Sequence, residues 1–426
     1  MISYLYSSLQ EFISNIYYFL FLCISISICI PFHNFIIYKV LCILLFSYWI
    51  LSGQIIEKIR KVIHNHLARF FVAFFLIYCI SYFFSENKDI ALDHIILYLP
   101  ILLFSLIFPS ISSINSDNLI NILKSFVIAV FCLNFYSVFD ALMSYFETKQ
   151  MSEFVYYKLT IHRMHPTYQS MFISFSTAIL FYFKKNNTIS LSNMFFYFLI
   201  ILNLIFILLL QSAIGVFIFS ILFLGHFFYE LYFGNKIFFS SVKILLFLLC
   251  VFSALYFSPS LKNKYSQSSD FLKYADNSEL ILASSQDRFI IWKSFFILIQ
   301  DSPLFGYGSG DAHMELQNQI KKESLEKTFI QQKYEALFKR DFNYHNQYFQ
   351  ILSSTGILGL FFFIMIFIRS CAMQFKEKNY LFLLFSFIFL SSCMTESILQ
   401  RQLGIYFFSF FTAFLSFYQI NSNKPA

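Results

Sequence analysis

Long apolar runs alternate with short polar connections along the chain, and this pattern dominates the sequence. Runs of about twenty apolar residues cross a bilayer as helices. Twelve such spans are predicted, at residues 12–31, 35–52, 67–84, 91–109, 119–140, 167–183, 192–211, 213–233, 239–258, 346–368, 380–396 and 402–419. We therefore expect an all-α polytopic membrane protein with about 12 transmembrane helices.

The seventh and eighth of these spans form one uninterrupted apolar stretch, residues 192–233. As a single helix of about 42 residues it would measure about 63 Å, twice the thickness of a hydrocarbon core of about 30 Å. The stretch must therefore fold back on itself. We expect the turn around "LLQSAIG", residues 209–215.

Basic residues lie in alternate connections, which predicts the orientation of the chain. They are Lys58, Arg60, Lys61, Arg69, Lys184, Lys185, Lys236, Lys243, Arg369, Lys376 and Lys378. The positive-inside rule places these connections in the cytoplasm. Both termini then fall on the cytoplasmic side, and the two longest polar connections, 147–166 and 259–345, fall outside.

The long outer connection divides the chain into three parts: a membrane domain at 1–258, an outer loop at 259–345, and a membrane domain at 346–426. The loop contains 11 basic and 11 acidic residues, so it is polar but balanced in charge. Within it, "DRFIIWKSFFILIQDSP" predicts a helix from Asp287 to Pro303 that is apolar nearly all round. We expect this helix to lie along the outer membrane surface, with Trp292 as its interfacial anchor.

Composition excludes several other kinds of protein. The chain is 58% hydrophobic and 12% charged, and its net charge of +7 comes from short connections between spans, which gives no support for a nucleic-acid partner. The eight cysteines lie in or beside spans without a CxxC pair, so disulfide and zinc sites have little support. Five histidines scattered over both faces make no metal-ligand spacing and are assigned no role: His33, His64, His66, His94 and His226.

Arginine is rare in this chain, and its positions are informative. Of seven arginines, Arg163, Arg288, Arg340 and Arg401 fall on the outer side, against the charge bias. The planar guanidinium fork binds phosphate oxygens in a bidentate manner and keeps its charge. Arg340 needs no functional role, because a polar outer loop of this size is expected to contain some arginine. Arg288 shares a helical face with Trp292, and Arg163 and Arg401 lie at the outer mouths of spans six and twelve.

A histidine stands where the tenth span begins, in "YHNQYFQILSSTGILGLFFF". Because imidazole titrates near pH 6.5, His345 could accept a proton from a hydroxyl group at neutral pH. It could equally be an interfacial polar residue, and the same two roles are open for His162 and His165. The glycines of "PLFGYGSGD" indicate a tight turn rather than a phosphate-binding loop.

Taken together, these segments resemble the signature region of the O-antigen ligase family. The resemblance rests on "DRFIIWKSFFILIQDSPLFGYGSGD" followed by "HNQYFQILSSTGILGL", and extends to "HPTYQSMFISF" and "TESILQRQLGIYFF". The family includes ligases, glycan polymerases and protein O-oligosaccharyltransferases, and these motifs do not separate them. The resemblance implies a membrane glycosyltransferase of the GT-C type.

The resemblance also implies a substrate and a place. An O-antigen ligase transfers a glycan from undecaprenyl diphosphate to the lipid A–core oligosaccharide in lipopolysaccharide biosynthesis, without a metal or other cofactor. It does so at the periplasmic face of the bacterial inner membrane. The alternatives are a surface-polysaccharide polymerase, then a protein O-oligosaccharyltransferase. A transporter or flippase would favour charges in mid-span and repeated halves, whereas here the charges gather at outer span mouths.

Residue by residue, the family's histidine falls on His345 and its loop arginine on Arg288. Asn346 and Trp292 would position the site. The family also carries a Ser-Arg pair at the turn between spans seven and eight. Here Ser212 is followed by Ala213, so Arg163 or Arg401 would have to supply the charge that binds the donor diphosphate.

Overall fold

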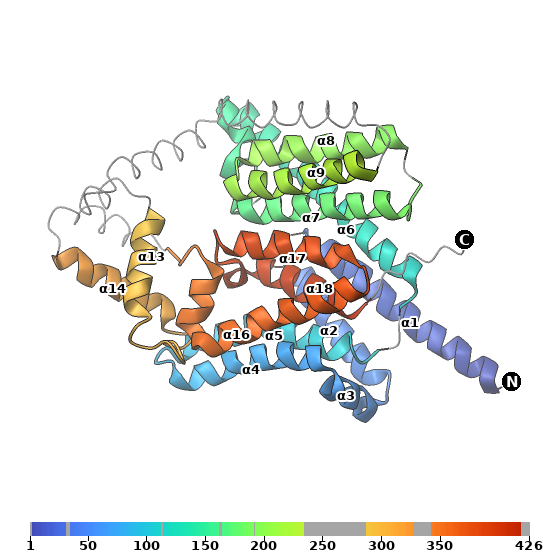
Figure 1. The fold of residues 1–426 in the computed structure, drawn as a ribbon, viewed down its shortest axis with the longest axis horizontal. Coiled ribbons are helices and arrows are strands. Elements are labelled where there is room, and N and C mark those ends of the chain that lie inside the picture. The colour runs from blue at the N-terminus through green and yellow to red at the C-terminus, as the bar shows by residue number, and fades with distance from the viewer. Residues whose placement is uncertain are drawn as a thin grey trace.

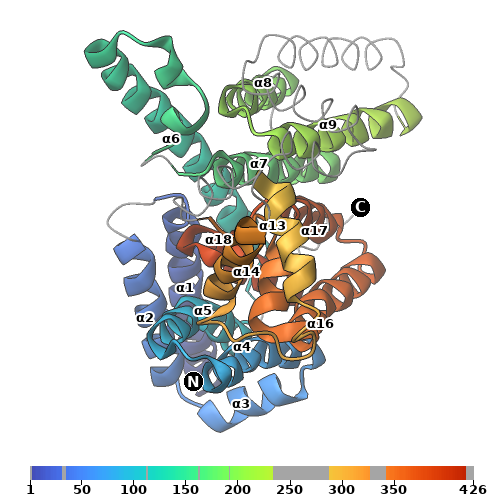
Figure 2. The ribbon, with the colours of Figure 1, turned by 90° about the vertical axis from the view of Figure 1, so that its left-hand side faces the viewer.

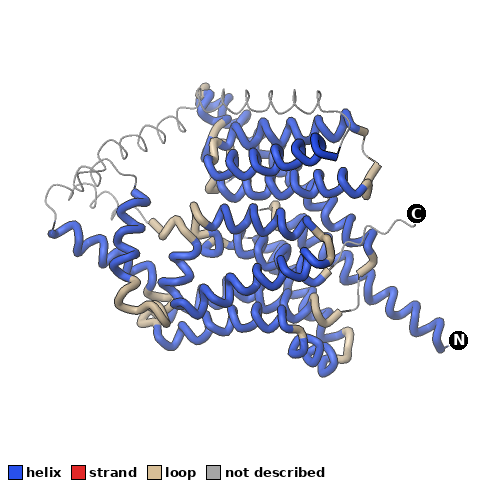
Figure 3. Tube along the Cα trace, in the orientation of Figure 1, coloured by secondary structure: helices blue, strands red, loops and turns tan. Residues whose placement is uncertain are grey.

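The computed structural model describes residues 2–30, 35–111, 114–161, 164–190, 192–233, 287–326 and 342–418. Within these ranges every regular element is helical, with 14 α-helices and a few short 3₁₀ turns (Figure 3). The α-helices are α1 (Ile2–Ser27), α2 (Ile36–Leu51), α3 (Ile55–His64), α4 (His66–Phe84), α5 (Lys88–Ile107), α6 (Ser116–Thr148), α7 (Pro166–Asn186), α8 (Asn193–Leu210), α9 (Ala213–Phe233), α13 (Asp287–Leu298), α14 (Ala312–Glu326), α16 (Gln347–Lys376), α17 (Tyr380–Cys393) and α18 (Gln402–Phe417).

Many of these helices are apolar enough to cross a membrane. In the described part of the chain, six are both long and apolar enough: α4, α5, α6, α8, α9 and α16. The bent pair α2 and α3 makes a seventh if it counts as one span, and α1, α17 and α18 contribute shorter apolar segments. The prediction of an all-helical, multi-pass membrane protein is confirmed. The number twelve is not, and the predicted span 239–258 lies outside the described residues.

The predicted sixth span forms α7, which differs from a lipid-facing helix. Every side chain from Pro166 to Phe183 is buried. The helix carries Gln169, Ser174 and Thr177 at buried positions, and polar side chains of this kind are tolerated in a membrane protein where other helices cover them. α7 is therefore an interior helix. It packs on α8 and α9 on one side and on α17 on the other (Figures 1 and 2).

A second interior helix, α18, is buried on all sides from Leu403 to Ser416. Phenylalanine rings surround it. The ring centroids of Phe126 and Phe411 lie 4.6 Å apart, and those of Phe172 and Phe407 lie 4.9 Å apart. Because lipid tails are as apolar as phenylalanine, such helices gain from close ring packing more than from burial itself. The two interior helices therefore hold the rest of the bundle around them.

The glycine-rich segment after α13 inserts a turn into a break in α16. Gly356 has φ 66° and ψ −166°, which interrupts the helix. The two backbone groups near the break pair with the turn instead: Tyr307 N donates to Ser353 O at 2.8 Å, and Ile357 N donates to Pro303 O at 3.0 Å. A broken helix is tolerated in a membrane protein when its backbone groups find partners in this way. The predicted turn is confirmed.

Two glycines make this docking possible. A Cβ on Gly356 would lie 2.0 Å from Leu304 O, and a Cβ on Gly306 would lie 2.5 Å from Ser353 O. The same segment reaches α5, because the carboxylate of Asp311 accepts the Asn87 N–H at 2.9 Å. The turn thus joins the segment between α13 and α14 to α16 at its break, and His345 directly precedes the N-cap of the same helix.

We expect Gly356→Ala to destabilise the protein by about 2–4 kcal/mol, because it combines a backbone conformation open almost only to glycine with a steric clash. The measurement is the apparent Tm of the purified protein in detergent. Gly225→Ala in α9 is the matched control, since nothing lies within 4 Å of the added Cβ. Equal Tm values for the two variants would contradict this account of the docked turn.

Candidate functional site

The segment before α16 is held rigidly on both sides of His345. On one side Tyr344 is fully buried, its hydroxyl donates to Ala312 O at 2.6 Å, and its own carbonyl accepts the Trp292 indole N–H at 3.0 Å. On the other side the Asn346 side chain caps α16 by accepting the Tyr348 N–H at 2.9 Å. The backbone that carries His345 is therefore fixed by neighbours that belong to three helices.

The backbone of His345 itself is in the left-handed region, with φ 46°. Its N–H donates to Asn343 Oδ1 at 2.8 Å, which closes a local turn. A left-handed conformation costs a residue with a side chain about 1–2 kcal/mol. Such strain persists only where surrounding contacts enforce it, and it is common at functional sites.

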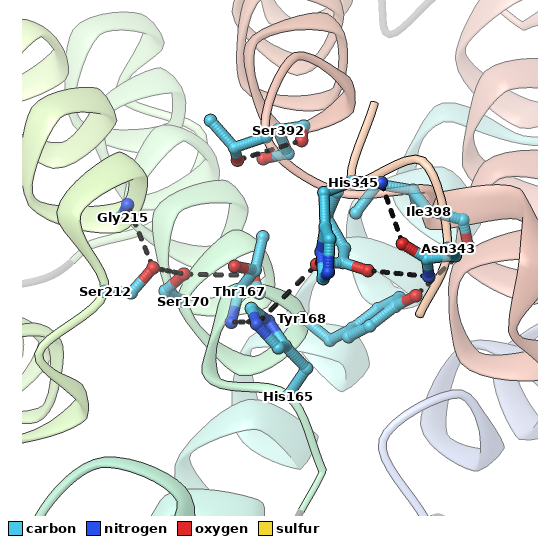
Figure 4. Close-up of polar contacts among 12 residues, drawn as sticks. His165, Thr167, Tyr168, Ser170, Ser212, Gly215, Asn343, His345, Ser392 and Ile398 are labelled. Atoms are coloured by element: carbon cyan, nitrogen blue, oxygen red, sulfur yellow. Dashed lines mark hydrogen bonds and ion pairs between the residues drawn. The ribbon is translucent and has the colours of Figure 1, made fainter. Parts of the chain in front are cut away.

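Three polar side chains, His345, His165 and Asn343, converge on the carboxylate of Glu396, in the connection between α17 and α18. Figure 4 labels these three side chains and shows them close together. His345 Nδ1 lies 3.2 Å from Oε2, His165 Nε2 lies 3.6 Å from the same oxygen, and Asn343 Nδ2 donates to Oε1 at 3.3 Å. Only 5% of the Glu396 side chain is exposed. The carboxylate thus joins the beginnings of α7 and α16 to the connection before α18.

These partners keep the carboxylate charged. Burial by itself raises the pKa of Glu396, but the hydrogen bond from His345, the charges of His165 and His345, and the hydrogen bond from Asn343 outweigh it. The pKa of Glu396 falls to about 2. Near neutral pH the group is therefore an anion that only accepts hydrogen bonds.

The charged carboxylate determines where each imidazole carries its proton. His345 must donate through Nδ1, so the neutral ring keeps its lone pair on Nε2. His165 Nδ1 accepts the Thr167 N–H at 3.3 Å at the start of α7, which leaves the proton on Nε2, facing Glu396. Of these two rings, His345 is therefore the one whose second nitrogen, Nε2, keeps a lone pair that can accept a proton.

The turn between α8 and α9 lies against the start of α7. α8 ends at Leu210 and α9 begins at Ala213, as predicted from the length of the apolar stretch. Ser170 Oγ lies 3.3 Å from Ser212 Oγ and 2.9 Å from Thr167 O, and Figure 4 shows this line of contacts leading toward His165. Ala213, the position where the family carries arginine, is exposed next to this line.

The histidine and carboxylate cluster opens into a cavity of about 1430 Å³. Its polar lining comes from separate segments of the chain and includes Asp93, His165, Asn343, His345, Glu396 and Arg401. Its apolar lining comes mainly from α2 and α5 and includes Ile43, Phe46, Leu99, Leu103 and Leu106. From Asp93 to Leu106 the lining follows α5 for about 20 Å. The cavity therefore joins a polar chamber to a long apolar groove.

Two arginines lie near this chamber. Arg401 is exposed at the start of α18 and lines the cavity. Arg288, at the start of α13, is half-buried and not part of the lining. Burial raises the pKa of Tyr157 on the cavity wall, and the charges of Arg288 and Arg401 both act against that rise. Both guanidiniums thus lie near one wall. Arg163, the third candidate, lies outside the described residues.

The predicted positioning residues have defined contacts. Asn346 caps α16 and also donates to Met394 O at 3.4 Å, so it ties α16 to the end of α17. The ring of Trp292 packs edge-on against Phe349, with the ring centroids 5.6 Å apart, and its indole N–H donates to the carbonyl of Tyr344, next to His345. Its expected role as an interfacial anchor stays a prediction. Within the described ranges, no group of three or more His, Cys, Asp or Glu side chains is arranged to hold a metal ion.

Sequence reasoning missed several residues of the chamber. Glu396 stands in "TESILQRQ", which resembles the family, but it received no role. The sequence alone does not decide between two roles for His165 and gives none to His94, although His94 lines the cavity with Nδ1 2.8 Å from Ser309 O. A lone acidic residue at the outer mouth of a span was the available signal for Glu396, because a buried charge there requires partners.

The fold and the chamber define a multi-pass helical membrane protein with a polar site that opens onto an apolar groove. A family model described as O-Antigen ligase matches residues 196–364. The match confirms, over that segment, the resemblance to the O-antigen ligase family. It contains Arg288, Trp292, His345 and Asn346, whereas His165, Glu396 and Arg401 lie outside it. No curated protein matches the chain.

Proposed function

We propose that this protein is an O-antigen ligase, a GT-C-type glycosyltransferase of the bacterial inner membrane. It would transfer a glycan from undecaprenyl diphosphate to the lipid A–core oligosaccharide. The observation that carries the proposal is the cavity, in which a histidine, a buried carboxylate and an arginine stand at the mouth of an apolar groove. A lipid-linked sugar has the same division into a polar head and a long apolar tail.

The donor would bind with its polyprenyl tail between α2 and α5. Its diphosphate would then lie beside Arg401, with Arg288 and Arg163 as further candidates for charge neutralisation. Guanidinium groups suit this task because they bind phosphate oxygens in pairs and stabilise the charge that develops on the leaving group. Arg401 would take the place of the family's arginine at the position of Ala213.

The reaction would be a single displacement. An acceptor hydroxyl attacks the anomeric carbon of the first sugar, the bond to the diphosphate oxygen breaks, and undecaprenyl diphosphate leaves. The proton of the hydroxyl passes to His345 Nε2, and the anomeric configuration inverts. The geometry supports His345 as this base, since its ring lines the cavity and its Nδ1–H is engaged by Glu396. The proposed steps use no metal and no nucleotide.

Glu396 would orient the ring of His345 and stabilise the imidazolium that forms when the proton arrives. A carboxylate behind a histidine base does this in many enzymes without taking up the proton itself. The low pKa of Glu396 supports the same division of roles, because the carboxylate stays charged when the imidazolium forms beside it. Asn346 and Trp292 would act as positioning residues for the segment that carries the base.

The chamber would face the periplasm and the termini the cytoplasm. Figure 1 supports this orientation, because the start of α1 and the basic helix α3 lie at the end of the bundle away from α13 and α14. The domain limits expected at 258 and 345 remain predictions. A surface-polysaccharide polymerase would use the same donor and the same base, so the acceptor decides between the two functions.

Deletion of the gene should leave the core oligosaccharide without polymer, while lipid-linked polymer accumulates, because ligation is the step that consumes it. Electrophoresis of lipopolysaccharide and extraction of lipid-linked glycans measure the two pools. Complementation with the wild-type chain is the control. A core capped by one repeat unit would instead identify a polymerase, and unchanged lipopolysaccharide would remove both functions.

A double-mutant cycle tests the base and its orienting carboxylate. His345→Gln should lower turnover by about 10²–10⁴-fold, because glutamine cannot serve as a base near neutral pH. Glu396→Gln should cost about 10–100-fold in kcat with little change in donor KM. In the His345→Gln background the same change should cost less than about threefold, because the carboxylate then has no base to orient.

The assay uses purified protein, lipid-linked donor and core acceptor. Glu153→Gln is the matched control, since Glu153 is also a buried carboxylate, paired with Lys158 at 2.6 Å but outside the cavity lining. Near-wild-type turnover by His345→Gln would remove the base from the mechanism. An equal loss from Glu396→Gln in both backgrounds would leave Glu396 as a purely structural residue.

A further inference from the structure

The short helix α3 turns sharply away from α2. The two helices make an angle of 109° across residues 52–54, where Gly53 has φ 76°. α2 runs along the cavity groove as part of the helical bundle, so a helix turned by about a right angle runs across the end of the bundle. Figure 1 shows α3 there, at the end away from α13 and α14. This orientation is that of a helix in the plane of a membrane surface.

α3 presents three different faces. Toward the protein it buries Lys58 and Val62. On a second face Ile56, Ile59 and Ile63, which repeat every three or four residues, are 79%, 43% and 58% exposed. The third face carries exposed polar residues. An exposed row of isoleucines is unfavourable in water, because it leaves apolar surface hydrated. A helix that lies in the bilayer interface buries such a row among the lipid chains.

The helix is firmly attached, so its exposed faces have a fixed direction. Lys58 Nζ donates to Ser52 Oγ at 2.7 Å and to the carbonyl of Trp49, and lies 5.4 Å from the centre of the Trp49 ring. The buried lysine therefore ties α3 back to the end of α2. The isoleucines and the basic side chains cannot exchange sides by rotation of the helix.

The polar face is basic. Arg60 and Lys61 are exposed, and Arg69 lies exposed near the start of α4. Glu57 offsets one of these charges, because it pairs with Lys61 at 3.3 Å with both side chains about half exposed. Long basic side chains beside an interfacial apolar face reach the headgroup layer, where they attract negatively charged lipids.

We propose that α3 lies in the membrane interface and binds anionic phospholipid headgroups through Arg60 and Lys61. The apolar face would insert into the membrane interface, and the two exposed cations would make α3 prefer negatively charged lipids. This site is separate from the catalytic chamber and stands whether or not the proposed ligase activity holds.

The full-length protein in neutral detergent would be titrated with phosphatidylglycerol and, separately, with phosphatidylcholine, and bound lipids would be counted by native mass spectrometry. The wild type should bind the first phosphatidylglycerol molecule at least about tenfold more tightly than the first phosphatidylcholine molecule. Each basic side chain near the headgroups contributes about fivefold to this preference. The double variant Arg60→Gln and Lys61→Gln should bind both lipids equally. Lys321→Gln with Lys322→Gln, an exposed basic pair on α14, is the matched control and should behave as the wild type.

Apparent Tm values show whether each variant is folded. Ile63→Asn should weaken the binding of both lipids to the same degree, because it reduces the apolar surface that inserts among the lipids and leaves the charge of the helix unchanged. Equal affinity of the wild type for the two lipids would overturn the proposal, and so would an unchanged preference in the Arg60 and Lys61 variant. A dimer of the wild type that the same variant abolishes would also overturn it, because the face would then bind a second copy of the chain.

Discussion

The carboxylate of Glu396 is almost fully removed from solvent, yet it remains charged. Burying a charge is costly unless hydrogen bonds and opposite charges compensate it. Here the compensation comes from His165 at the start of α7, and from Asn343 and His345 before α16. These segments are distant in the sequence and cannot move apart without leaving an uncompensated charge. The arrangement of the polar chamber therefore depends on this one group.

The rest of the architecture holds the segments of the chamber in place. The turn at Gly306 enters the break in α16 at Gly356, and this contact fixes α13 and the segment before α16 in one position. α2 and α5 then leave the groove that continues from the chamber into the apolar part of the bundle. The proposed transfer from a lipid carrier requires a base held above a groove for the polyprenyl tail, since the reacting atoms must meet in one fixed geometry.

The sequence predicted what local patterns encode. Apolar runs gave the helical membrane fold, the fold-back near Ser212 and the helix that begins at Asp287, and the motifs placed His345 at the mouth of α16. What failed depends on contacts between distant segments. Glu396 and His165 come into contact only because α7 and α17 pack together. α7 is an interior helix only because other helices surround it. A hydropathy pattern does not report either fact, which is also why the number of spans stays open.

The most direct measurement is a cryo-electron microscopy structure of the protein in a lipid nanodisc with an undecaprenyl-diphosphate-linked glycan and no acceptor. The account predicts density for the diphosphate beside Arg401, with the first sugar facing His345 and the polyprenyl tail between α2 and α5. Density for the lipid outside that groove, or a diphosphate held away from the chamber of His345 and Glu396, would contradict it.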